Sequence, residues 1–222
     1  MIEAVIFDFD GLILDTETPT YEIFAELFRD RGAELPIDVW ANIVGSSDHF
    51  DVYRYMEEKT GAPIDRDAIV AEVKARYLPR IEASPPRPGV PEMIASVVAR
   101  GLRRGVASSS GREWVTGHLE RLGLIAHFEQ FATGDEVEKT KPDPALFFLA
   151  AERLNVAPRN CLVFEDSRNG LVAAKAAGMH VAIIPNGITR RLDFSMADFV
   201  LESMAERTLD SLIEELSAGA RG

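Results

Sequence analysis

Near its N-terminal end the chain reads AVIFDFDGLILDTE, residues 4–17, and this stretch decides the fold. The apolar residues 4–7 are typical of a strand that is buried on both faces of a sheet. Two carboxylates, Asp8 and Asp10, follow where the strand ends, and Gly11 can turn the chain. Open α/β sheets bind their ligands beyond the carboxyl ends of the strands, where unpaired charge is expensive to bury. The stretch therefore predicts an active site, and a bound divalent cation would explain its acids.

Composition and charge describe an ordinary globular chain. Its 222 residues are 46% hydrophobic and 27% charged, which suits one large domain or a domain with a substantial insert. A net charge of −12 argues against a nucleic-acid or anionic-membrane surface, so a local cation would have to attract any phosphorylated ligand. We expect no N-terminal signal, no membrane span and a reduced cytoplasmic setting, in which the single Cys161 is a small core residue.

Short apolar runs alternate with helical patterns along most of the chain. This alternation predicts an α/β fold, with a parallel sheet covered by helices on both faces. The predicted strands are 4–9, 105–108, 128–133, 161–164, 181–184 and a weaker one at 199–201. The predicted helices between and after them are 91–100, 113–122, 144–154, 169–177 and 209–216.

The interval between the first two strands is far longer than a crossover helix requires. It spans roughly 90 residues and contains four further helical patterns, at 19–31, 37–44, 50–59 and 67–81. An all-helical insert after the first strand is the economical interpretation. We therefore predict a core domain formed by residues 1–15 and 84–222 and a helical domain formed by residues 16–83.

The first motif supplies two carboxylates with distinct chemical uses. Asp8 can attack phosphorus to form an acyl phosphate, which divides a difficult displacement into two easier ones. Asp10, two residues on, can protonate the departing oxygen and later take a proton from water. Ordinary solvated acids at a strand end are the alternative interpretation of this segment.

Three further segments at predicted strand ends complete a set of groups for phosphoryl transfer. Ser108, Ser109 and Ser110 run into a helix, so they form either an anion cradle or a serine N-cap. Lys141 can place an ammonium group against a phosphoryl oxygen, unless it is an exposed loop lysine. Glu165 and Asp166 can bind Mg²⁺, or they can be acids that favour a helix N-terminus.

Together the four segments resemble motifs I to IV of the haloacid dehalogenase-like (HAD) superfamily, in the group with a helical cap inserted after motif I (the C1 cap group, which includes β-phosphoglucomutase). The resemblance spans essentially the whole chain. It implies a Rossmann-like core, a mobile cap, an aspartyl-phosphate at Asp8 and a general acid/base at Asp10. The implied phosphate-binding groups are Ser108, the amide of Ser109 and Lys141. The implied Mg²⁺ ligands are Asp8, the backbone carbonyl of Asp10, Asp166, and Glu165 directly or through water.

Departures from the family's patterns favour a phosphatase. Dehalogenases need no proton donor and typically lack the second motif I aspartate, whereas Asp10 is present here. β-Phosphoglucomutases carry a cap histidine just after motif I and an arginine in the cap loop. Residues 17–21 contain no histidine and residues 44–49 no arginine, although Arg54 follows. The mutase remains the closest alternative, and a non-catalytic role is disfavoured because no motif residue is lost.

The substrate is less clearly indicated than the reaction. A capped site suggests a small phosphate monoester, because the cap must close over the substrate and exclude water. We expect Glu17, Ser46 and Ser110 to contact it. Sugar phosphates, phosphoglycolate-like acids and nucleoside monophosphates all remain open, and the sequence does not indicate an oligomeric state.

Overall fold

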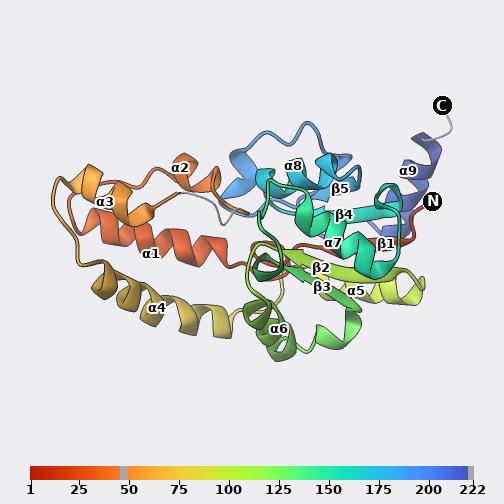
Figure 1. The fold of residues 1–222 in the computed structure, drawn as a ribbon, viewed down its shortest axis with the longest axis horizontal. Helices are drawn as coiled ribbons and strands as arrows, with labels where there is room; N and C mark the ends of the chain where they lie inside the picture. Colours follow the sequence, from red (N-terminus) through yellow and green to blue (C-terminus); the bar gives the residue numbers. More distant parts are fainter. Residues whose placement is uncertain (46–49, 220–222) are drawn as a thin grey trace.

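The computed structural model describes residues 1–45 and 50–219 of the chain (Figure 1). At its centre lies a six-stranded parallel sheet with the strand order β3-β2-β1-β4-β5-β6. The strands are β1 Ala4–Phe7, β2 Arg103–Ser108, β3 Gln130–Thr133, β4 Cys161–Glu165, β5 His180–Ile183 and β6 Phe199–Val200. The predicted α/β fold is confirmed, and each predicted strand segment contributes to the sheet.

Strand β1 shows why helices cover both faces of the sheet. Its four residues are fully buried, with Val5 and Phe7 in one apolar cluster and Ala4 and Ile6 in another. Because side chains alternate across a strand, each cluster needs its own layer of helices. The first cluster is covered by α5 Val90–Ala99, α6 Arg112–Arg121 and α9 Leu209–Gly219. The second is covered by α7 Ala145–Leu154 and α8 Arg168–Ala176.

The direction of strand progression reverses between β1 and β4. From β1 the chain proceeds outward to β3, then returns to place β4 on the opposite side of β1. Ligands of such sheets bind in the crevice that this reversal opens at the carboxyl ends of the strands. The motif acids after β1 and β4 are therefore neighbours at this crevice.

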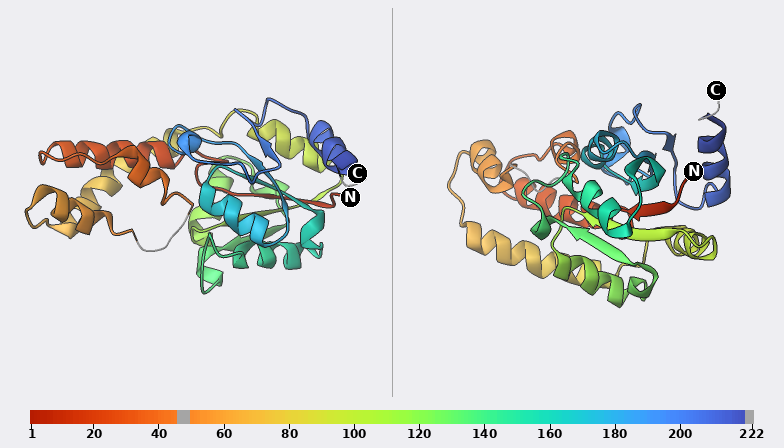
Figure 2. Two further views of the ribbon diagram at one scale, coloured as in Figure 1. Left: turned by 90° about the horizontal axis from the view of Figure 1, so that it is seen from above. Right: turned by 45° about the vertical axis from the view of Figure 1, so that its right-hand side comes forward.

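The interval between β1 and β2 is helical, as predicted. It contains α1 Glu17–Arg29, α2 Ile37–Ala41, α3 Val52–Thr60 and α4 Arg66–Ala83. These helices project beyond the sheet (Figure 2) and share a third apolar cluster around Trp40, Phe28 and Met56. On this basis we propose residues 16–83 as the cap domain. Helix α2 is shorter than predicted, because the carbonyls of Asn42 and Val44 accept hydrogen bonds from the side chain of Asn169.

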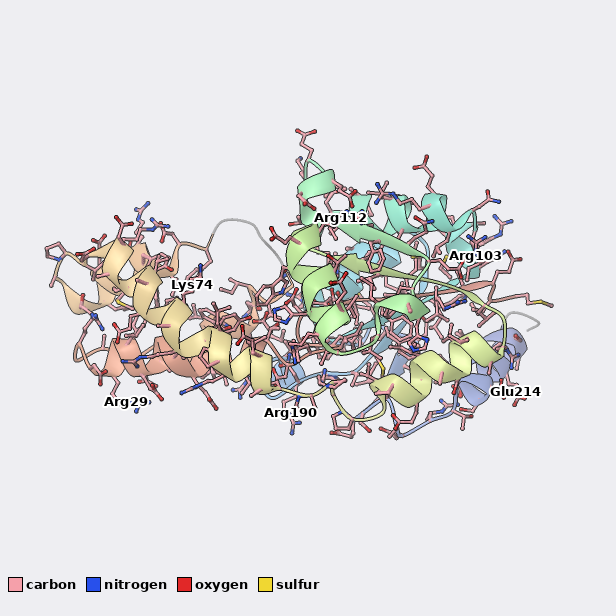
Figure 3. The ribbon with its side chains drawn as sticks, turned by 90° about the horizontal axis from the view of Figure 1, so that it is seen from below. Arg29, Lys74, Arg103, Arg112, Arg190 and Glu214 are labelled. Atoms are coloured by element: carbon pink, nitrogen blue, oxygen red, sulfur yellow. The ribbon has the colours of Figure 1, made fainter. Side chains whose placement is uncertain are left out.

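Helix α4 packs on both the cap and the core. Ile69 is buried in the cap cluster, whereas Ile81, near the other end of the helix, is buried in a core cluster. Lys74 on α4 and Arg29 at the end of α1 point outward into solvent (Figure 3). None of the helices in the described part of the chain is long and apolar enough to span a bilayer.

Two linkers join the cap to the core, and both are tied to the core by hydrogen bonds. Strand β1 ends at Phe7 and not at the predicted Phe9, because the Phe9 carbonyl accepts amide hydrogen bonds from the turn that follows. In the second linker, the Arg87 guanidinium donates to the carbonyls of Gly11, Ile184 and Pro185. The chain thus re-enters the core at a point fixed by three backbone carbonyls.

Candidate active site

The predicted motifs converge on one cavity of about 450 Å³ between the sheet and the cap helices. Asp8 follows β1, Ser108 ends β2 and Glu165 ends β4. The core wall of the cavity comprises Asp8, Asp10, Ser108, Ser109, Ser110 and Trp114. The cap wall comprises Thr16, Glu17, Thr20, Trp40, Ile43, Val44, Gly45 and Tyr77.

Lys141 is fully buried beneath the core wall, where it pairs with two carboxylates. Its Nζ donates to Asp8 Oδ1 at 2.5 Å, to Glu165 Oε1 at 2.7 Å and to the Ala107 carbonyl at 2.9 Å. Burial by itself lowers the pKa of Lys141, but the charges of Asp8 and Glu165 outweigh it and hold the pKa above its ordinary value. The lysine therefore remains cationic against Asp8, the predicted nucleophile.

Glu165 has both carboxylate oxygens engaged by the protein itself. Oε1 accepts from Lys141, and Oε2 accepts from the amides of Asp166 and Ser167, each at 2.8 Å, and from the Ser167 hydroxyl at 2.9 Å. A carboxylate with this many donors is held in place and has little capacity left for a direct metal bond. The arrangement favours the version of the prediction in which Glu165 acts through water.

Asp166, in contrast to Glu165, has only one of its carboxylate oxygens engaged by the protein. Its Oδ2 accepts from the amide of Asn186 at 2.6 Å, but its Oδ1 is buried and has no hydrogen-bond partner in the described structure. Buried polar atoms are normally satisfied, so a partnerless carboxylate oxygen that is aimed into a site requires an explanation. A cation at this oxygen provides one.

The buried cluster Asp8, Glu165 and Asp166 has the donor set of a divalent-metal site. One carboxylate oxygen from each lies within 4.8 Å of the others. Burial raises the pKa of Asp8 and of Asp166, and the neighbouring carboxylates raise both further, while Lys141 lowers that of Asp8. A bound divalent cation would relieve this repulsion, and hard oxygen ligands are what Mg²⁺ prefers. The residues present therefore fit a metal ion.

The Asp10 side chain points toward helix α6. Its Oδ2 accepts from the hydroxyls of Ser110 at 2.7 Å and Ser108 at 3.2 Å, and its Oδ1 accepts from Trp114 Nε1 at 2.9 Å. Ser110, a predicted substrate contact, thus binds the predicted acid/base. Trp114, whose bonding to Asp10 was not predicted, is the third donor to the same carboxylate.

Two core residues hold the cap loop that follows α2. The Ser109 hydroxyl donates to the Gly45 carbonyl at 2.8 Å, and the Asn169 amide donates to the Val44 carbonyl at 2.8 Å. The Ser109 side chain is therefore directed to the cap, which leaves its backbone amide for the predicted phosphate contact. Ser46, the remaining predicted substrate contact, lies outside the described residues.

Glu17 begins helix α1 and lines the cavity opposite the core acids. Burial raises its pKa from 4.5 to about 7, and the charge of Asp10 adds to the shift. Trp40 counters the shift in part, although its indole nitrogen makes no hydrogen bond of ordinary geometry. The hydroxyl of Thr16 is likewise buried without a partner. This wall therefore presents polar groups that the described protein does not satisfy.

Comparison with known proteins now identifies the family. A sequence profile of the haloacid dehalogenase-like hydrolases matches residues 5–184, which include all four motifs. The chain belongs to this family. It is 45% identical over 218 residues to "Putative phosphatase YhcW" of Bacillus subtilis, which covers 98% of this chain and 99% of the relative. This confirms the predicted enzyme class, a HAD-family phosphatase.

Two further HAD relatives place the chain in the CbbY and β-phosphoglucomutase-like group. It is 32% identical over 188 residues to the "Phosphorylated carbohydrates phosphatase" of Thermotoga maritima, covering 80% of this chain and 82% of the relative. The solved structure of CbbY from Rhodobacter sphaeroides in complex with phosphate has 29% identity and a TM-score of 0.75, covering 96% of this chain and 100% of the other. The predicted superfamily and the predicted group within it are therefore both confirmed.

Sequence reasoning missed three contacts of the site. Asn186 follows β5, and its place at the carboxyl end of a strand was the available signal. Trp114 lies on a helix, where a tryptophan ordinarily serves packing, and no spacing in the sequence joins it to Asp10. Gly45 contacts Ser109 across the domains, which only the fold reveals.

Proposed function

We propose that this HAD-family phosphatase hydrolyses small phosphate monoesters of sugars or polyols, with Mg²⁺ as cofactor and an aspartyl-phosphate on Asp8 as intermediate. One observation carries the proposal. Asp8 is buried 2.5 Å from the ammonium group of Lys141, in a cluster with Asp166, which has a partnerless carboxylate oxygen. The ammonium group of Lys141, together with a cation bound at Asp166, would offset the repulsion between the carboxylate of Asp8 and an approaching phosphate dianion.

The first half-reaction transfers the phosphoryl group to the enzyme. A carboxylate oxygen of Asp8 forms a bond to phosphorus while the bond from phosphorus to the ester oxygen breaks. The carboxyl group of Asp10 gives its proton to the departing oxygen, so that a neutral alcohol leaves. Lys141, the Ser108 hydroxyl and the Ser109 amide stabilise the charge of the phosphoryl oxygens.

The second half-reaction returns the enzyme to its starting state. Asp10, now a carboxylate, takes a proton from a water molecule whose oxygen attacks phosphorus. The bond between phosphorus and Asp8 breaks, and inorganic phosphate leaves. Mg²⁺ held by Asp8, Asp166 and the Asp10 carbonyl would neutralise phosphoryl charge in both halves.

The cap wall supports a neutral, hydroxyl-rich leaving group. Trp40 and Tyr77 offer aromatic faces for the C–H surface of a sugar, and Glu17 offers a carboxyl group to its hydroxyls. A second anionic group would approach Glu17 unfavourably, which argues against phosphoglycolate-like acids. Relatives named for carbohydrate substrates agree with this, among them the 32% identical "Hexitol phosphatase B" of Escherichia coli.

The test is phosphate release from a panel of phosphate monoesters, with Mg²⁺ and with EDTA. The panel holds hexose, pentose and hexitol monophosphates, phosphoglycolate and a nucleoside monophosphate. We expect Mg²⁺-dependent release that is fastest with the sugar or polyol esters and absent in Asp8→Asn, which keeps the shape of Asp8 and removes the nucleophile. Retained turnover in Asp8→Asn would contradict the assignment of Asp8.

β-Phosphoglucomutase-like chemistry is the second candidate, because that group shares the fold. The crystal structure of a putative β-phosphoglucomutase from Thermotoga maritima is 28% identical to this chain, with a TM-score of 0.74. A mutase must hold a bisphosphorylated sugar with its second phosphate in the cap, where Glu17 lies here. Including β-glucose 1-phosphate with a coupled detection of glucose 6-phosphate separates the two, since isomerisation without net phosphate release would show a mutase.

A further inference from the structure

Asp10 is held at both carboxylate oxygens by three neutral donors, two serine hydroxyls and one indole N–H. Ser110 and Ser108 bind Oδ2 from the end of β2 and the turn after it. The indole N–H of Trp114, from the first turn of α6, binds Oδ1 at 2.9 Å. Because the serines share a single oxygen, Trp114 is the donor that fixes the rotation of the carboxylate plane.

The same indole is stacked between the two domains. Its ring lies 5.8 Å from that of Tyr77 on α4, nearly parallel at 16°. The ring of His118 lies 4.1 Å from the Trp114 ring at 70°, and His118 in turn stacks on Phe9 at 6.2 Å. Phe9 immediately precedes Asp10 in the chain. Trp114 therefore contacts a cap helix, the carboxylate of the acid and, through His118, the backbone that carries the acid.

Packing alone does not account for a tryptophan at this place. A phenylalanine would preserve the stack with Tyr77 and the edge contact with His118, whereas only the indole supplies an N–H. A general acid transfers its proton over hydrogen-bond distance, so a displacement of about 1 Å can lower the rate about 100-fold. A donor that fixes the carboxylate plane is therefore expected to affect protonation of the leaving group more than binding.

We propose that Trp114 is the positioning residue of Asp10, and that its stacking on Tyr77 makes the orientation of Asp10 depend on the position of cap helix α4. The inference rests on the proposed function, because it assigns Asp10 the role of acid. It adds to that function a residue through which the cap acts on the reaction itself and not only on substrate binding.

The kinetic test compares an ester with a poor leaving group, glucose 6-phosphate, and an activated one, p-nitrophenyl phosphate, whose departure needs little protonation. In Trp114→Phe we expect kcat for the sugar ester to fall about tenfold, the usual effect of losing a hydrogen bond to a charged group, with little change in KM. For the aryl ester we expect a change of less than about twofold. Equal losses on both esters would mean that Trp114 serves packing, and would overturn the proposal.

Two further variants test whether Trp114 acts through Asp10 and whether its effect depends on helix α4. In an Asp10→Asn background, Trp114→Phe should not change the ratio of kcat for the aryl ester to kcat for the sugar ester, because the acid on which it acts is gone. A further rise of that ratio in the double variant would contradict action through Asp10. Tyr77→Leu removes the ring of cap helix α4 from the stack. It should raise the ratio by about threefold, because it weakens the hydrogen bond from Trp114 to Asp10 without removing it. An unchanged ratio would overturn the dependence on α4.

A spectroscopic test works without turnover. The chain contains two tryptophans, so the ¹H–¹⁵N spectrum of the protein shows two indole signals, which Trp40→Phe assigns. Replacing Asp10 by Ala should shift the Trp114 indole proton upfield and leave the Trp40 signal in place. An unchanged Trp114 signal would show that the hydrogen bond is absent. If the wild type hydrolysed none of the sugar and polyol esters of the panel, the proposed function would fail, and this spectrum would still decide whether Trp114 holds Asp10.

Discussion

The two walls of the active site differ in how completely the protein satisfies their polar groups. On the core side, Lys141 and Glu165 have their polar atoms engaged by one another, by Asp8 and by the backbone, and Asp166 Oδ1 is the one buried oxygen left without a partner among the described core residues. On the cap side, Thr16 and Trp40 carry buried polar atoms without partners among the described residues, and burial raises the pKa of Glu17 to about 7. Apart from that oxygen, the core side is organised before any ligand arrives, whereas the polar groups of the cap wall are left for a ligand to complete. We propose that the core carries most of the reaction and the cap most of the selectivity.

The largest expected effect comes from removing the central charge of the core wall. Lys141→Met leaves Asp8 and Glu165 buried without their cation, so we expect a loss of about 3–5 kcal/mol in the free energy of unfolding and no measurable turnover. Urea denaturation followed by circular dichroism measures the first, and phosphate release the second. Lys139→Met is the matched control, because that lysine is exposed on the same loop and should change neither. A stable Lys141→Met variant would show that the network does not support the fold.

Glu165, the last residue of β4, and Asp166, which follows it, should differ in what they control. Asp166→Asn should raise the Mg²⁺ concentration needed for half-maximal activity by about 10–100-fold, because its partnerless oxygen is the one available to a cation. Glu165→Gln should instead lower stability, because it disturbs the bonds to Lys141 and to the amides after β4. Mg²⁺ titrations and urea melts of both variants measure the contrast. The reverse pattern would make Glu165 the direct ligand.

A smaller effect is expected where the cap touches the core. A methyl group at Gly45 would overlap the Ser167 side chain, and the backbone there has a φ of +81°, so Gly45→Ala should displace the cap loop and lower kcat/KM for sugar phosphates about tenfold. Gly61→Ala is the control, since Gly61 has a similar φ of +67° but open space around it. Steady-state kinetics of both variants separates backbone strain from domain contact. Equal kcat/KM values in the two variants would exclude a role for the contact.

The smallest expected effect is that of Glu17 on the pH dependence of the free energy of unfolding. Its pKa is about 7 in the folded chain against an ordinary 4.5, so the native state binds more protons than the unfolded state between these values. The contribution of Glu17 to stability therefore falls as the pH rises through this window, and Glu17→Gln should remove that contribution. We expect the variant to be more stable than wild type by about 1 kcal/mol at pH 8, less than the full shift implies because the cavity hydrates the side chain, and nearly equal at pH 5. Urea melts in EDTA at the two pH values measure this. A pH-independent difference would show that Glu17 is not perturbed.

Features carried by local sequence patterns could be predicted, and those carried by contacts between distant segments could not. The motif residues Asp8, Ser108 and Glu165 lie at strand ends that apolar runs reveal, and Lys141 lies in the loop between β3 and α7, so the fold and the place of the site followed from the chain itself. The end of β1 was placed two residues late, because Phe7-Asp8-Phe9 keeps a strand-like alternation through the turn that the Phe9 carbonyl organises.

The different roles of Glu165 and Asp166 in the acid cluster could not be predicted from the sequence. Glu165 and Asp166 are adjacent and chemically alike, and only their partners, Lys141 on one side and Asn186 on the other, distinguish them. Trp114 likewise resembles any tryptophan of an amphipathic helix until the fold brings its N–H to Asp10.

The anchoring of Arg87 has a consequence for how such enzymes can diversify. Its guanidinium holds the second linker to the carbonyls of Gly11, Ile184 and Pro185, all of them core residues. The geometry at which the chain re-enters the sheet is therefore set without help from the cap helices. A different helical unit joined between Thr16 and Arg87 would meet the same fixed attachment points and leave the acid cluster undisturbed. The chain is accordingly suited to cap exchange, in which a recombinant protein keeps the acid cluster and acquires the substrate preference of the donor, provided that the new cap supplies a ring in the place of Tyr77 for Trp114 to stack on.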